Sequence, residues 1–250
     1  MENFLKKYFW ILKLCLLIQG ISLGLYQWIF ESPMGSFLFL NIDLPEKYAY
    51  GADDLVGVSL IVASILSLFW KNLVIFLYIF LCFFMFALFQ TIIGGLPHTN
   101  LTLFAHAARY LTPIGLYFLL RNSKSGITIL KVGVSLTFIA HGIECLYKDP
   151  LFVDYLIYAL KWFSLNEDGA NNLLLIIGTA DILVGIISLI WVNPWVYFYM
   201  AFWGLFTAFY RVLYEGGPGY LSMLMRSSHY FVPLFLGFYV LKFRKKKVSL

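Results

Sequence analysis

The chain has 250 residues, of which 61% are hydrophobic, 20% aromatic and only 12% charged. Soluble domains carry about 25% charged residues, so this composition excludes an ordinary soluble domain and indicates a membrane protein. The net charge of +5 does not indicate a nucleic-acid partner, because the basic residues lie at the ends of apolar runs rather than on one continuous face.

Eight apolar runs reach the length of about 20 residues that crosses a lipid bilayer. The first follows Lys6 and Lys7 and has no small-residue cleavage site after it, so we expect an uncleaved first helix. The sequence therefore predicts an all-α membrane protein with eight transmembrane helices. The runs are residues 9–30, 54–70, 73–93, 101–120, 127–147, 171–191, 195–214 and 219–241.

Lysine and arginine are concentrated on one side of this arrangement, and most acidic residues lie on the other. By the positive-inside rule the basic side is cytoplasmic, so we expect a protein of the cell membrane, of the bacterial inner-membrane type, with both termini in the cytoplasm. The outer segments 34–50 and 151–165 follow prolines and predict short amphipathic helices on the outer membrane surface. The basic side carries Lys6, Lys7, Lys71, Arg121, Lys124, Lys242, Arg244, Lys245, Lys246 and Lys247.

Four landmarks recur in the same order about 120 residues apart. Internal repeats of this kind indicate a duplicated unit, here residues 1–123 and 124–250. Because each unit has an even number of spans, the two copies should run parallel, as two four-helix bundles. The landmarks are Ile11-Leu12-Lys13 with Ile129-Leu130-Lys131, residues 65–72 with 186–193, Gly94-Gly95 with Gly216-Gly217, and residues 106–113 with 226–233.

Ionisable side chains inside the predicted spans are the candidates for function, because they are costly in lipid. The last span of each unit has a basic pair at i and i+3 followed by tyrosine, and a proline one turn deeper, which we expect to kink the helix. Arginine, histidine and tyrosine together suit an anionic or quinone-like ligand approached from the outer side. The candidate binding residues are His106, Arg109, Tyr110, Arg226, His229, Tyr230, His141, Glu144, Asp181 and Arg211.

These groups have a second interpretation, in which they pair with one another, lock the helices together and bind nothing. Arg109 or Arg226 would then pair with Glu144, Arg211 with its neighbour Glu215, and Asp181 with a tyrosine. Metal binding is not expected, because the histidines lack a metal-ligand spacing and lie beside arginines. The three cysteines have no CxxC spacing and are expected to be packing residues.

One pair of predicted spans resembles a known family. The run 127–147 begins near Lys131 and ends in His141 and Gly142, and the next run places Asp181 among small residues. This pattern is similar to the DoxX-like (DoxX/DoxD) membrane proteins, in which a basic residue begins an apolar helix that ends in His-Gly.

The resemblance implies a four-helix bundle, present here twice, and an association with quinone-linked sulfur oxidation and terminal oxidases. It is weaker in the first half, where Leu23 and Gly24 replace the His-Gly pair and Leu60 stands where Asp181 would fall.

Three functions fit these observations. The first is a quinone- or redox-associated subunit, with the two basic pairs holding a polar headgroup. The second is a non-catalytic scaffold or assembly component that docks a membrane or periplasmic protein. The third, a small-molecule transporter, is disfavoured because the polar groups cluster near one face. No nucleophile–base pair or nucleotide motif points to a particular reaction.

Overall fold

The structure, a computed structural model, describes residues 2–94 and 99–244, and all regular secondary structure in these two segments is helical. Gly95, Lys245, Lys246 and Lys247 of the predicted landmarks and basic tail lie outside the described residues. The helices are α1 (Glu2–Ile29), α2 (Pro33–Leu40), α3 (Glu46–Leu66), α4 (Leu73–Ile93), α5 (Thr99–Ala105), α6 (Ala107–Leu120), α7 (Ser125–Leu146), α8 (Pro150–Ala159), η1 (Lys161–Phe163), α9 (Glu167–Ile190), α10 (Pro194–Glu215), α11 (Gly217–Met225) and α12 (Ser228–Arg244).

Within the described segments, six helices are long and apolar enough to cross a membrane: α1, α3, α4, α7, α9 and α10. They coincide with six of the predicted spans, and a multi-pass, all-α class is thereby confirmed. The expected count of eight is not confirmed, because the predicted spans 101–120 and 219–241 are interrupted. Each is divided into a short helix and a longer one, α5 with α6 and α11 with α12.

Both interruptions are stabilised by residues distant in the sequence. His106 (φ −97°, ψ 6°) and Arg226 (φ −90°, ψ 12°) leave helical geometry at matching positions. The Ala108 N–H of α6 donates to Thr137 Oγ1 of α7 at 2.9 Å, and Ser227 Oγ donates to the Cys15 carbonyl of α1 at 3.0 Å. The helices therefore break before the prolines that were expected to kink them, since Pro113 and Pro233 both lie inside regular helix.

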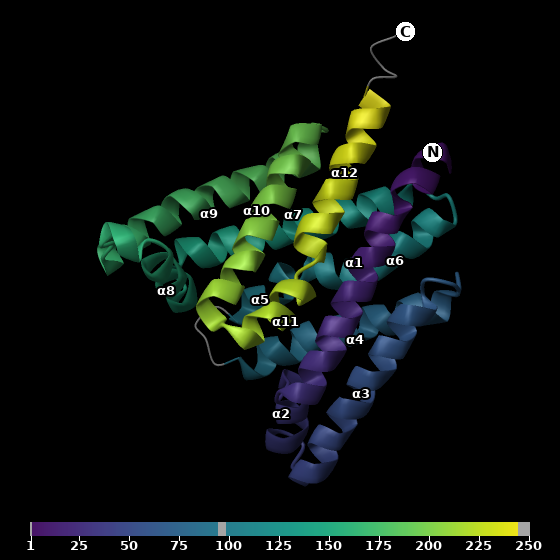
Figure 1. Ribbon diagram of the computed structural model, residues 1–250, viewed down its shortest axis with the longest axis horizontal. Coiled ribbons are helices and arrows are strands. Elements are labelled where there is room, and N and C mark those ends of the chain that lie inside the picture. The colour runs from purple at the N-terminus through teal and green to yellow at the C-terminus, as the bar shows by residue number, and fades with distance from the viewer. Residues whose placement is uncertain (1, 95–98, 245–250) are drawn as a thin grey trace.

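Figure 1 shows how the helices of the two halves pack against each other. Within each half, α1 packs on α3 and α4 on α6, as α7 packs on α9 and α10 on α12. Between the halves, α6 packs on α7 and α12 on α1. The N-terminal end of α1 lies beside the C-terminal end of α12, where the Phe4 ring contacts the rings of Tyr239 and Phe243. Both ends of the chain are consequently on the same side of the molecule.

Helices α9 and α10 form a hairpin whose two arms diverge from the short turn that joins them. Helices α9 and α10 separate on leaving residues 191–193, and α8 packs against both of them (Figure 1). Helix α2 contacts α3 and α4 in the same way. The two short helices predicted after the prolines are present, and each lies between the arms of a diverging hairpin.

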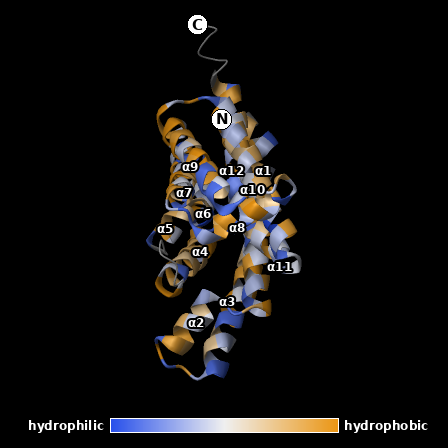
Figure 2. Ribbon diagram, turned by 90° about the vertical axis from the view of Figure 1, so that its left-hand side faces the viewer, coloured by the Kyte–Doolittle hydropathy of each residue, from blue (hydrophilic) through white to orange (hydrophobic). Residues whose placement is uncertain are grey.

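The outward faces of the long helices are apolar. Leu55, Val74, Ile176 and Phe202 are each at least 66% exposed, and Figure 2 shows hydrophobic stretches along α4, α7 and α9. A soluble protein does not expose so much contiguous apolar surface. This surface is what a lipid bilayer covers in a multi-pass membrane protein.

Several local contacts recur at positions that the sequence landmarks pair. Asn72 and Asn193 cap the first turns of α4 and α10, and Ser32 and Asp149 cap those of α2 and α8. Backbone contacts recur too: a Cβ atom on Gly24 would lie 2.4 Å from the Gly57 carbonyl oxygen, and one on Gly142 would lie 2.6 Å from that of Gly178. The geometry of one half is therefore matched locally in the other.

The lysines that open the two halves also make matching contacts. Lys13 Nζ donates to the Leu68 carbonyl at 2.7 Å, and Lys131 Nζ donates to the Leu189 carbonyl at 2.8 Å. Carbonyls at the end of a helix have no partner within that helix. Lys131 therefore satisfies a carbonyl in the last turn of α9, and Lys13 satisfies one in the turn that follows α3.

We expect Lys131→Met to lower stability by about 1 kcal/mol, because this terminal carbonyl of α9 loses its charged donor while the aliphatic stem is kept. The measurement is the midpoint of thermal unfolding in detergent. Lys124→Met is the control, because the Lys124 side chain is exposed and makes no hydrogen bond or ion pair to the residues that the structure describes. Equal midpoints for the two variants would show that the Lys131 contact contributes nothing.

Candidate functional site

A cavity with a volume of about 150 Å³ lies inside the C-terminal half. Helices α7, α8, α9, α10 and α12 contribute to its wall, together with Arg226 at the break before α12. Most of the wall is apolar or aromatic, and a few polar groups project into it. The polar and titratable side chains on the wall are Thr137, His141, Cys145, Tyr155, Asp181, Trp203, Thr207, Tyr210, Arg211, Arg226 and His229.

Two histidines face each other at this cavity. The ring centroids of His141 and His229 are 5.7 Å apart. His141 Nδ1 lies 2.7 Å from Glu144 Oε2, one turn along α7. A carboxylate at Nδ1 favours the proton there and leaves Nε2 as a lone-pair acceptor in the neutral ring. Among the described residues, Nε2 of both histidines is buried without a hydrogen-bond partner, so both are available to a ligand.

Arg211 is held at the wall by an acid and an aromatic ring. Its Nη1 donates to Glu215 Oε1 at 3.2 Å, and the guanidinium lies 5.2 Å from the centroid of the Tyr155 ring. The Tyr155 hydroxyl donates to the same Glu215 oxygen at 2.6 Å. Burial, together with this hydrogen bond, raises the pKa of Tyr155 to about 12. At neutral pH the phenol is therefore protonated and ties α8 to α10.

Arg226 lines the cavity without an acidic partner. No ion pair to it is found among the residues that the structure describes. Its nearest charges include Arg211, Arg109 and Glu144, and Glu144 is already occupied by His141. An arginine side chain stays protonated in proteins, so the cavity wall carries an uncompensated positive charge.

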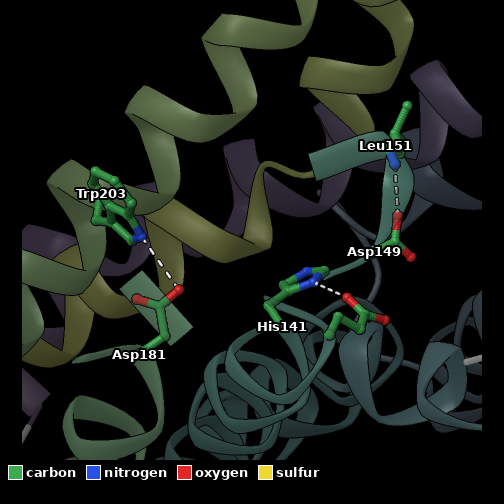
Figure 3. A network of polar contacts seen from close by, with 6 residues as sticks. His141, Asp149, Leu151, Asp181 and Trp203 are labelled. Atoms are coloured by element: carbon green, nitrogen blue, oxygen red, sulfur yellow. Dashed lines mark hydrogen bonds and ion pairs between the residues drawn. The ribbon is translucent and has the colours of Figure 1, made fainter. Parts of the chain in front are cut away.

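Asp181 lies on another part of the wall, on α9. The Trp203 indole N–H donates to its Oδ2 at 3.4 Å, and Oδ1 is buried without a partner among the described groups. Figure 3 shows this pair apart from the His141–Glu144 contact, with the His141 side chain between Asp181 and Asp149 in the view. His141 and His229 interact electrostatically with Arg226, whereas the specific interaction of Asp181 is with Trp203, so we distinguish an Arg–His end and an Asp–Trp end of the cavity wall.

The remaining predicted residues lie outside the cavity wall. His106 and Arg109 are buried behind it, and Arg109 instead lines a second void of about 10 Å³ with Gln19 and Met225. Tyr110 packs against the Phe84 ring at 5.4 Å between centroids, and Tyr230 against Phe231 at 4.9 Å. The predicted residues on the wall are His141, Asp181, Arg211, Arg226 and His229.

The structure answers in part whether the polar groups pair among themselves. Arg211 pairs with Glu215, as that interpretation expects. Glu144 pairs with His141 rather than with an arginine, and Asp181 accepts a hydrogen bond from a tryptophan rather than from a tyrosine. Internal pairing therefore accounts for one arginine and leaves Arg109 and Arg226 without an acid among the described residues.

Sequence reasoning missed the aromatic wall. Helix α8 was expected on the membrane surface, but its residues Phe152 and Tyr155 also line the cavity. On α10, Trp203, Thr207 and Tyr210 line it too. Their spacing of four and three residues places them on one face of a helix. This polar stripe along residues 195–214 could have predicted that α10 lines the site.

The corresponding interior of the N-terminal half is filled. The landmarks pair His141 and Asp181 with Leu23 and Leu60, and they pair Gly204 and Thr207 with Phe83 and Phe86. Leu60 and Phe83 are at most 2% exposed, and Leu23, Phe83 and Phe86 border the small void of about 10 Å³. The ligand-sized cavity therefore belongs to the C-terminal half.

In the described part of the chain no cluster of three or more His, Cys, Asp or Glu side chains could hold a metal ion. Comparison of the chain with protein-family models, curated proteins and solved structures finds no match. Fold and site together define a helical, multi-pass membrane protein with a mostly apolar cavity that carries a few polar side chains on its wall. Its function has to be argued from that cavity.

Proposed function

We propose that the chain is a quinone-binding, redox-associated subunit of the cell membrane, with the C-terminal cavity as the headgroup site. The observation that carries this proposal is the pair of histidines, half-buried His141 and buried His229, which line one apolar cavity and whose Nε2 atoms are buried without a hydrogen-bond partner among the described residues. Quinone carbonyls accept hydrogen bonds, and quinol hydroxyls donate them. A neutral imidazole suits both forms because one ring nitrogen donates a hydrogen bond and the other accepts one.

The size and lining of the cavity suit one aromatic headgroup. A volume of about 150 Å³ holds a single ring, and Phe152 and Trp203 supply aromatic surface against which it would pack. Phe206, also on the wall, is 51% exposed, so the cavity reaches the apolar surface of α10. An isoprenoid tail would leave by this route into lipid, between the diverging helices α9 and α10.

We also propose that the chain is a tandem duplication related to the DoxX-like proteins, with eight membrane-crossing elements and both termini in the cytoplasm. The fourth and eighth crossings are then the broken pairs α5–α6 and α11–α12. Irregular backbone is tolerated at membrane depth where it is buried in protein or lines a cavity. The matched lysine, glycine and capping contacts of the two halves support the duplication. As a redox subunit, the protein would exchange electrons with a membrane or periplasmic partner.

The test is equilibrium binding of a short-chain quinone to the purified protein in nanodiscs. Wild type is expected to bind, and His229→Leu is expected to bind about tenfold more weakly, the loss of one hydrogen bond. His106→Leu is the matched control: His106 is equally buried but lies off the cavity wall, so its affinity should stay within about twofold of wild type. Absence of binding by folded wild type would refute the proposal.

A further inference from the structure

The Arg–His end of the cavity holds more positive than negative charge. Arg109, Arg211 and Arg226 act electrostatically on one another or on the same histidines. Of the two acids nearby, Glu144 is taken by His141 and Glu215 by Arg211. A buried charge without a partner is strongly unfavourable, so an anion bound at this end would stabilise the site.

The backbone adds to this positive potential. Helix α12 has 17 residues and begins at Ser228, two residues beyond Arg226. The N-terminus of a helix carries a partial positive charge that favours anions in its first turn. His229 lies in that turn, is only 4% exposed, and directs an unpartnered Nε2 to the cavity. Side chain and helix end therefore act on the same volume.

We propose that the cavity binds anionic forms of its lipophilic ligand, the semiquinone and the quinolate, in preference to the neutral quinone. This inference rests on the proposed function and specifies the charge of the species that the site favours. One electron from a reduced one-electron carrier converts the neutral quinone into the semiquinone anion, with no bond broken and no proton transferred. The new negative charge lies on the quinone oxygens, and Arg226 and His229 hold the oxygen at their end.

Asp181 fixes the direction in which such an anion lies. It is the one carboxylate found on the wall among the described residues, and it is paired with Trp203. A charged oxygen is disfavoured beside it and favoured beside Arg226 and Arg211. The other titratable groups that face the ligand are His141, Cys145, Tyr155, Tyr210 and His229, with Glu144 behind His141.

The test compares two ligands that differ in charge and by one methyl group. An alkyl hydroxynaphthoquinone is an anion at about pH 8, because its acidic hydroxyl is ionised, whereas its O-methyl ether is neutral. Wild type in nanodiscs is expected to bind the hydroxy compound at least about tenfold more tightly than the ether. Arg226→Gln should remove this preference, and Arg226→Lys should keep part of it. Arg121→Gln, at the exposed end of α6, should leave it unchanged.

The outcomes separate this inference from the function on which it rests. If neither compound nor a plain quinone binds, the proposed function is wrong. If the ether binds as tightly as the anion, the ligand site stands and the charge preference is refuted. Should Arg226→Gln not fold, wild type decides alone: its preference must disappear when the pH is lowered until the hydroxyl of the ligand is protonated, with the ether measured at each pH as the reference. A preference that persists there would also refute it.

Discussion

Gly142→Ala is expected to destabilise the protein by about 1–3 kcal/mol, the cost of overpacking a close contact. A Cβ atom on Gly142 would lie 2.6 Å from the Gly178 carbonyl oxygen and 2.9 Å from the Ile182 amide nitrogen. Both are backbone atoms, so α7 and α9 must move apart. Helix packing in lipid depends on such close approach because apolar burial adds little there. The two helices also carry His141 and Asp181, so quinone affinity should fall together with stability.

The measurement is thermal unfolding in detergent, alongside quinone binding in nanodiscs. Gly51→Ala is the control, since a Cβ atom at Gly51 of α3 meets nothing within 4 Å, and alanine favours a helix over glycine. Gly24→Ala should destabilise the matching contact with Gly57, 2.4 Å away, and leave the C-terminal cavity intact. A Gly142→Ala protein that unfolds at the wild-type temperature would show that α7 and α9 are not in close contact.

Much of the fold could be predicted because it depends on local sequence. Charge depletion and apolar run length gave the membrane class and six of the spans, and the prolines Pro33 and Pro150 mark the starts of α2 and α8. The two helix breaks depend on distant partners instead. Thr137 of α7 accepts the Ala108 amide, and Cys15 of α1 accepts the Ser227 hydroxyl. No reading of residues 101–120 or 219–241 alone could show these contacts.

The candidate site was predicted less completely, because periodicity shows which residues share a helix face and not where that face points. His141 and Glu144 are three residues apart and share a face of α7, where they are hydrogen-bonded, although the sequence had suggested an arginine as the partner of Glu144. Tyr110 was assigned to the site because it follows Arg109, but consecutive helical residues point in different directions, and Tyr110 packs on α4. The cavity itself arises where Gly204 and Thr207 stand at the positions of Phe83 and Phe86. The landmarks pair these positions in the sequence, but only the packing of α7, α8 and α9 shows that the smaller residues border a cavity.

Replacing the polar groups of the cavity with the residues of the other half should weaken binding without loss of stability. In the variant His141→Leu, Asp181→Leu, both positions carry the leucine that the landmarks place at 23 and 60, and Glu144→Gln is added so that the carboxylate that pairs with His141 is not left as an unpaired buried charge. Leu23 and Leu60 are at most 3% exposed in a well-filled interior. Exchanging buried polar groups for apolar ones of similar volume is often neutral or stabilising, by about 1–4 kcal/mol. Quinol affinity should fall by about tenfold, because His141 Nε2 no longer accepts a hydrogen bond from a quinol hydroxyl.

The reverse exchange provides the matched control. Leu60→Asp places a carboxylate in the closed interior of the N-terminal half. The landmarks put Cys82 at the position of Trp203, so the indole N–H that pairs with Asp181 has no counterpart there. Leu60→Asp should destabilise the protein by several kcal/mol as an unpaired buried charge and leave quinone affinity unchanged in the fraction that folds.

If the double leucine variant were instead strongly destabilised, the His141–Glu144 and Asp181–Trp203 contacts would be structural, as a scaffold requires. If it kept full affinity, the ligand would have to bind elsewhere. On the proposed duplication, the polar groups at positions 141 and 181 distinguish the two halves, and this pair of variants measures whether these groups have any effect besides ligand binding.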